Sequence, residues 1–136
     1  WAVASWYVTL HAGAMHSKLI RVETGDTIFG NMTRTGSETW FINGVDLRTK
    51  ENATLTVSES ILTTQPWVYV TLEVYDVTSC SQYPPSGTEM PYSNLTLFVG
   101  GKQTTIDWTV GTDGQSPPIC DAKIAVKDAA DVTITF

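Results

Sequence analysis

Residues 66–77 carry the side chains in this sequence whose types and spacing are best suited to chemistry. Apolar and polar positions alternate there with a period of two, which predicts a β-strand with two different faces. The core-facing side is then Val68, Val70, Leu72 and Val74. The opposite side is Trp67, Tyr69, Thr71, Glu73 and Tyr75. Rings that flank a carboxylate suit carbohydrate or peptide binding, because rings stack on apolar ligand faces while the carboxylate accepts hydrogen bonds.

Glu73 is the member of this face that could act as an acid or a base. Exclusion of water by neighbouring rings favours a protonated carboxyl, as a general acid requires. One carboxylate without a second catalytic group does no chemistry, however. We therefore predict no catalytic residue and favour an aromatic face that packs under a long loop or against another subunit. A ligand face formed by Trp67, Tyr69, Glu73 and Tyr75 is the alternative.

Three of the four asparagines open an Asn-x-Thr sequon without proline, which is the acceptor for N-linked sugar. They are Asn31, Asn52 and Asn94. Thr-rich strands in which Thr happens to follow Asn are the alternative explanation. If the sequons are used, the chain is made in a eukaryotic secretory pathway and carries bulky, solubilising sugar on its surface.

The two cysteines, Cys80 and Cys120, allow one intrachain pairing, and each lies near a Pro-Pro pair. This context predicts a disulfide between two loops in an oxidising compartment. We expect no metal ion and no cofactor, because the chain has no C-x-x-C motif and His11 and His16 lack acidic or sulfur neighbours at ligand spacing.

Composition limits the partners of the chain. A net charge of −6, with eight scattered basic residues, argues against nucleic acid, which requires clustered Lys and Arg. No apolar run reaches the length of a membrane span. The chain begins at Trp1 without a signal peptide, so we expect a processed form or a segment of a longer protein. An extracellular location is predicted.

The elements that must position these residues are β-strands. Alternation with a period of two recurs at 54–58, 94–99, 105–110 and 132–136, and Thr and Val favour a pleated, half-buried surface. Gly100-Gly101 predicts a tight hairpin between residues 93 and 110. A second hairpin is predicted to join 123–127 to 132–136, with a short helix over 121–131 as the alternative. Nine or ten strands predict one all-β domain, 1–136, built as an antiparallel two-sheet β-sandwich of jelly-roll type.

Four segments of the chain match the pattern of a known family. They are residues 5–7, 20–28, 52–57 and 67–76, with Trp6-Tyr7 in the first and Gly25-Asp26-Thr27-Ile28 in the second. These segments resemble the second half of the eqolisins, the glutamic peptidases with a concanavalin-like β-sandwich. The resemblance covers about residues 5–77 and implies that Glu73 occupies the place of the catalytic glutamate.

The chain departs from that family in one essential residue. Eqolisins pair their glutamate with a glutamine from strands that precede the Trp-Tyr strand, and the sequence starts almost at that strand. The glutamines present, which match no family motif, are Gln65, Gln82, Gln103 and Gln115. Without the partner glutamine, activation of water and stabilisation of the oxyanion are lost. The resemblance therefore implies the fold and argues against peptidase activity.

Residues 1–10 read as an uncharged apolar strand, whose large side chains must be buried somewhere. The strand either lies inside its own sandwich or completes the sheet of a neighbouring subunit as an exchanged terminal strand. Exchange that runs head to tail without closing would build a filament. The residues that would form this assembly strand include Trp1, Val3, Trp6, Val8 and Leu10.

Three functional classes follow from these observations. We favour a non-enzymatic, secreted structural glycoprotein that self-associates through β-strand contacts into an oligomer or filament and bears N-linked glycans. The first alternative is a lectin-like carbohydrate-binding module. The second alternative, a glutamic-type peptidase, is least favoured because the partner glutamine is missing.

Overall fold

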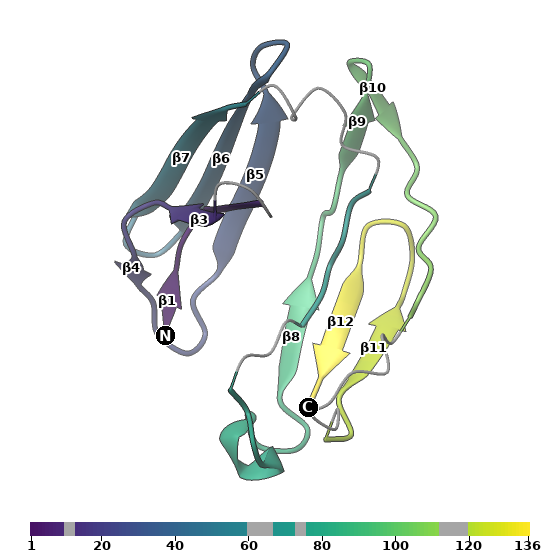
Figure 1. Cartoon of the computed structure of the whole chain (residues 1–136). Coiled ribbons are helices and arrows are strands. Elements are labelled where there is room, and N and C mark those ends of the chain that lie inside the picture. The colour runs from purple at the N-terminus through teal and green to yellow at the C-terminus, as the bar shows by residue number, and fades with distance from the viewer. Residues whose placement is uncertain (10–12, 60–66, 73–75, 112–119) are drawn as a thin grey trace. The chain divides into compact units, whose positions relative to one another are not determined.

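The computed structural model describes residues 1–9, 13–59, 67–72, 76–111 and 120–136 (Figure 1). These residues form short antiparallel strands and one 3-10 helix, and no α-helix occurs within them. The chain divides into two compact units, Trp1–Val68 and Tyr69–Phe136, each described here by itself. Whether the two units together form the single domain predicted over 1–136 stays a prediction.

The first unit contains one three-stranded sheet and two short strand pairs. Its strands are β1 (Ala2–Val3), β2 (Trp6–Thr9), β3 (Gly13–His16), β4 (Ile20–Arg21), β5 (Ile28–Arg34), β6 (Thr39–Asp46) and β7 (Asn52–Ser58). Strands β5, β6 and β7 run side by side in that order in Figure 1, while β1 pairs with β4 and β2 pairs with β3. All pairs are antiparallel.

The alternation predicted for residues 54–58 is confirmed in β7. Ala53 and Val57 are buried, whereas the threonines between and beside them are exposed. Val57 forms the first unit's small core with Tyr7 of β2, and three partly buried side chains pack against it: Trp40, Ile42 and Leu55. This core lies on the inner face of the sheet. The opposite, outer face carries a mixture of polar residues, such as Asn31 and Asn43, and apolar residues: Phe29, Phe41 and Val45.

The N-terminal segment is held within its own unit. Val3 pairs with Ile20, and Trp6 pairs with His16. Ser5 is buried, and its Oγ donates to the Ala53 carbonyl of β7 over 2.5 Å. The described part of residues 1–10 is thus paired within its own unit, and exchange of this strand between chains stays a prediction.

The sequence did not determine which side of β2 is buried. Tyr7 is buried, whereas Trp1, Trp6 and Val8 of the expected assembly strand are exposed, and Val3 is half-buried. Both sides of this segment are apolar, so its pattern alone cannot choose between them. Leu10 lies outside the described residues.

The second unit contains another three-stranded sheet and a separate hairpin. Its elements are η2 (Cys80–Gln82), β8 (Glu89–Tyr92), β9 (Leu97–Val99), β10 (Lys102–Thr104), β11 (Lys123–Val126) and β12 (Val132–Thr135). Strand β12 lies between β8 and β11 (Figure 1). Val132, Ile134 and Phe136 are all buried, which confirms the alternation predicted for 132–136.

Both predicted hairpins are confirmed. Val99 pairs with Lys102 across Gly100 and Gly101, whose φ values of 59° and 78° are those that a tight two-residue turn requires. In the other hairpin Val126 pairs with Val132, so β11 and β12 replace the alternative helix over 121–131. The disulfide prediction is also confirmed, since Cys80 and Cys120 are bonded with their Cα atoms 5.4 Å apart.

Two segments predicted as strands lie outside any strand in their described residues. Residues 105–110 are outside any strand, and Trp108 instead donates its indole N–H to the Ala129 carbonyl over 3.0 Å. Residues 67–72 are likewise outside any strand, and Val68 is exposed instead of facing a core. Alternation shows that a segment could present two different faces as a strand, but a strand also needs a hydrogen-bonded partner strand. Neither segment has such a partner among the described residues.

Candidate functional site: the free edge and outer face of strand β5

The aromatic face predicted around Glu73 is described only in part. Trp67 and Tyr69 are 72% and 71% exposed, so neither ring packs under a loop. Glu73 and Tyr75 lie outside the described residues. The structure therefore shows that the two rings at the start of this face, Trp67 and Tyr69, are accessible.

The described glutamines have no catalytic neighbours. Gln82 Oε1 accepts hydrogen bonds from the backbone N–H groups of Thr78 and Ser79 over 2.7 and 3.0 Å, which caps the start of η2. Gln103 lines an open pocket in the second unit. Gln65 and Gln115 lie outside the described residues. Gln82 thus has a structural role that explains its presence.

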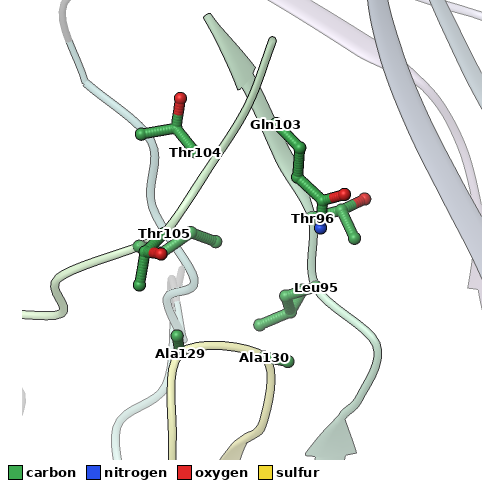
Figure 2. Close-up of a pocket in the computed structure, with 8 residues that line it drawn as sticks. Leu95, Thr96, Gln103, Thr104, Thr105, Ala129 and Ala130 are labelled. Atoms are coloured by element: carbon green, nitrogen blue, oxygen red, sulfur yellow. The ribbon is translucent and has the colours of Figure 1, made fainter.

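The pocket beside Gln103 has a volume of about 430 Å³ (Figure 2). Its lining consists of Leu95, Thr96, Gln103, Thr104, Thr105, Ile106, Ala129 and Ala130. Hydroxyl and amide groups there can bind a neutral ligand, but none of these side chains is charged and none can act as a general base at neutral pH. The pocket therefore does not support a catalytic reaction.

A cluster of charges in the first unit joins the turn before β5 to the turn after β6. Arg48 donates to both carboxylate oxygens of Asp26, over 2.6 and 2.9 Å. Its guanidinium also lies 3.7 Å from Glu23 and 3.9 Å from Asp46. Asp26 further accepts the backbone N–H of Glu23, so the cluster links two chain segments that lie far apart in sequence.

The pKa values in this cluster follow from its hydrogen bonds. The bond from Arg48 lowers the pKa of Asp26 to about 2, and the same pair raises the pKa of Arg48. Asp46 is fully buried, and the hydroxyl of Thr49 is the main cause of its lowered pKa. Every carboxylate here has a hydrogen-bond donor or a cation, so the cluster stabilises two turns and offers no free acid or base.

Among the residues that the structure describes, no group of three or more His, Cys, Asp and Glu side chains could hold a metal ion. In that same part of the chain, no helix is long and apolar enough to span a bilayer.

Strand β5 is one of the two edge strands of the first unit's three-stranded sheet. Within the described ranges it is paired only with β6, from Ile28 opposite Asp46 to Arg34 opposite Trp40. All seven of its residues are exposed, and three of them are large and apolar: Ile28, Phe29 and Met32. A long apolar edge with unpaired N–H and C=O groups is a template for pairing with another strand.

The outer face of the sheet carries two of the three sequons. Cross-strand pairing places Asn31 opposite Asn43, and Asn43 opposite Thr54. Thr33 donates its hydroxyl to Asn31 Oδ1 over 2.9 Å, and Thr54 donates to Asn52 Oδ1 over 3.1 Å. Asn31 and Asn52 are both exposed, so a glycan could be attached to each without disturbing the inner core.

Asn94 is exposed for a different reason than strand alternation. Its φ of 56° places it in the left-handed region, at a bend before Leu95, whose N–H donates to the Ala130 carbonyl. Asn tolerates this conformation better than most residues. The residue thus has a backbone role as well as a sequon, and use of all three sequons stays a prediction.

Comparison with known proteins identifies the fold. No protein-family model matches the sequence, and no curated protein matches it. The crystal structure of aspergilloglutamic peptidase from Aspergillus niger is similar, with a TM-score of 0.66 and 21% identity over 96% of this chain and 78% of the peptidase chain. The resemblance to the eqolisin fold is confirmed, as is the all-β, antiparallel β-sandwich class. At this identity the similarity shows the fold alone.

Proposed function

We propose that this chain, whose fold resembles that of the eqolisins, is a non-enzymatic, secreted structural glycoprotein that self-associates through β-strand contacts. The edge position of β5, which pairs with β6 alone among the described residues, is the observation that supports this proposal best. The strand offers seven exposed residues whose backbone groups can extend the β5–β6–β7 sheet with a strand from another copy.

The expected strength of one such contact is modest. Burying the exposed parts of Ile28 and Met32, which lie on the face opposite Asn31, would contribute about 1.5–3 kcal/mol. Loss of translational and rotational freedom costs about 4–15 kcal/mol, so one edge contact is weak by itself. Stable assembly would then depend on repeated contacts along an oligomer or filament.

The secretory part of the proposal has separate support. The disulfide between Cys80 and Cys120 is compatible with an oxidising compartment. Asn31 and Asn52 are exposed acceptors whose threonine hydroxyls bind the amide oxygen, so Nδ2, the atom that would carry the sugar, is not needed for that bond.

A lectin-like module is the second candidate, and the exposed rings of Trp67 and Tyr69 favour it. Binding of a sugar by ring stacking would depend on both aromatic side chains, whereas self-association through β5 would depend on neither. A glutamic-type peptidase is the third candidate. It rests on the structural similarity to aspergilloglutamic peptidase and on the position of Glu73 in the sequence, and the missing partner glutamine opposes it.

Self-association can be tested with one matched pair of variants. Met32 in β5 is 66% exposed and Val99 in β9 is 59% exposed, so Lys at either position costs little in the isolated chain. Met32→Lys also keeps the Asn-x-Thr sequon intact. We expect the parent chain and Val99→Lys to form oligomers or filaments in light scattering and negative-stain microscopy, whereas Met32→Lys weakens association at least tenfold. A monomeric parent chain at high micromolar concentration, or unaltered assembly of Met32→Lys, would refute the proposal.

A further inference from the structure

We infer that a glycan on Asn31 docks back onto its own strand, with its first sugar packed between the ring of Phe29 and the side chain of Thr33. The inference rests on the glycoprotein part of the proposed function and extends it, because it assigns the sugar a binding site and an effect on stability.

Phe29 is an aromatic residue on the outer face of the sheet, and 52% of it is exposed. The same face carries Phe41, which is half-buried and pairs with Thr33. The cross-strand neighbour of Phe29 on that face is Val45, whose own neighbour is Asn52. The core of the unit lies on the opposite face, so Phe29 does not contribute to it.

The spacing along β5 suits a sugar. Residues at i, i+2 and i+4 of a strand point to the same face, at intervals of about 6.8 Å. Phe29, Asn31 and Thr33 have this spacing, and all three are exposed. A pyranose attached to the middle residue can therefore contact the side chain on either side of it.

The chemistry of the three residues is complementary to such a sugar. A pyranose presents C–H groups on one face, and these pack on an aromatic ring. The bond from the Thr33 hydroxyl to Asn31 Oδ1 restrains the amide that would carry the sugar. A restrained linkage loses less entropy when the sugar docks.

The other two sequons lack this arrangement. The residue two positions before Asn52 is Lys50, which precedes β7 and has a φ of 64°. Tyr92 stands two positions before Asn94, but Asn94 lies in a left-handed bend, outside the strand that contains Tyr92. Asn52 is therefore a natural control, because it lies on the same sheet face without an aromatic residue at i−2.

The test uses the full chain secreted from a eukaryotic cell line, and site occupancy is measured first by mass spectrometry of glycopeptides. Thermal unfolding is then compared for the parent chain, Asn31→Gln, Phe29→Leu and the double variant. We expect loss of the Asn31 glycan to lower Tm by about 2–6 °C when Phe29 is present and by less than about 1 °C in the Phe29→Leu background. Asn52→Gln should change Tm by less than about 1 °C in both backgrounds.

The outcomes separate the two proposals. Equal losses of Tm in both Phe29 backgrounds, with Asn31 occupied, would overturn the docking inference and leave the secreted glycoprotein intact. An unoccupied Asn31 would overturn both the docking inference and the assignment of a glycan to that residue. Coupling between Phe29 and the glycan in a chain that stays monomeric would support docking while it refutes self-association.

Discussion

At the scale of single residues, Arg48 has the largest set of ionic partners among the described residues. It is about half exposed, yet the side chains of Asp26 and Asp46 beside it are almost fully shielded from solvent. A shielded carboxylate is tolerated when a cation and hydrogen-bond donors surround it, and removal of the cation leaves the carboxylate uncompensated. Arg48 therefore links the stability of two turns to the ionisation of Asp26.

Replacement of Arg48 should destabilise the protein in a pH-dependent manner. The folded-state pKa of Asp26 is lowered to about 2 from 3.8, so its contribution to stability is present above about pH 4 and is lost as pH falls toward 2. We expect Arg48→Met to be less stable than the parent chain at pH 7, with a difference that narrows between pH 5 and pH 2. Urea unfolding at pH 7, 5 and 3 measures it.

Arg34 provides the matched control for that experiment. Its guanidinium donates to the carbonyls of Gly36 and Ser37, which do not titrate. Arg34→Met should therefore show a difference from the parent chain that is the same at each pH. A pH-independent effect of Arg48→Met as well would contradict the role assigned to the Asp26 pair.

At the scale of elements, the sequence predicted those features that depend on local signals. Gly100-Gly101 specifies a tight turn by itself, and the alternation of Val132, Ile134 and Phe136 marks one buried face. The segment 66–77 has an equally regular pattern, but its residues 67–72 form no strand. Strand pairing depends on partners that are distant in sequence. The alternation of residues within one segment does not indicate whether such a partner exists.

The candidate site was predictable to a similar degree. The sequons could be read from the sequence, as could the cysteines, because each motif carries its own chemistry. The edge position of β5 could not, since it depends on the order of strands in the sheet. The sequence does show Phe29 and Asn31 at positions i and i+2. This spacing places their side chains on the same face only if both residues belong to a strand.

The packing of β1 on β6 can be tested with two glycines of the same sheet. Gly30 and Gly44 pair directly across β5 and β6. A Cβ added to Gly44 would lie 3.1 Å from Val3 Cγ1, whereas one added to Gly30 would meet nothing within 4 Å. We expect Gly44→Ala to lower the free energy of unfolding by about 1–2 kcal/mol.

Gly30→Ala should be neutral or stabilising by up to about 0.5 kcal/mol, because it removes only the backbone freedom of the unfolded glycine. Chemical denaturation of the two variants gives the comparison. Equal effects would indicate that β1 does not pack on β6 in solution.

At the scale of the whole molecule, the chain has a fold similar to that of a peptidase, and its sequence offers a candidate for the catalytic glutamate, Glu73, but no glutamine that matches the family pattern. The similarity extends over 96% of the chain, beyond the 5–77 segment that the sequence pattern matched. A fold does not imply an activity, because activity depends on the groups placed on it. The charged cluster and the pocket that the structure describes supply no free acid–base pair.

We accordingly predict no peptidase activity between pH 2 and pH 8. Without a glutamine partner, Glu73 cannot both activate water and stabilise an oxyanion, so cleavage should stay at the level of a buffer blank. A fluorescent casein digest, followed for 24 hours beside a Glu73→Gln variant, is the measurement. Cleavage that the variant abolishes would establish the peptidase candidate instead.

The central position of β12 has a consequence for synthesis of the chain. Tyr92 of β8 pairs with Val132 of β12, 40 residues later, and β11 pairs with the same strand from its other side. At roughly 5–20 residues per second, β8 leaves the ribosome about 2–8 s before its partner is made. During that interval β8 has no ladder partner within its sheet, and its unpaired backbone can engage chaperones or other nascent chains. The sheet of the second unit therefore cannot be completed before β12, its last strand, is translated. The rate of elongation determines how long β8 remains unpaired.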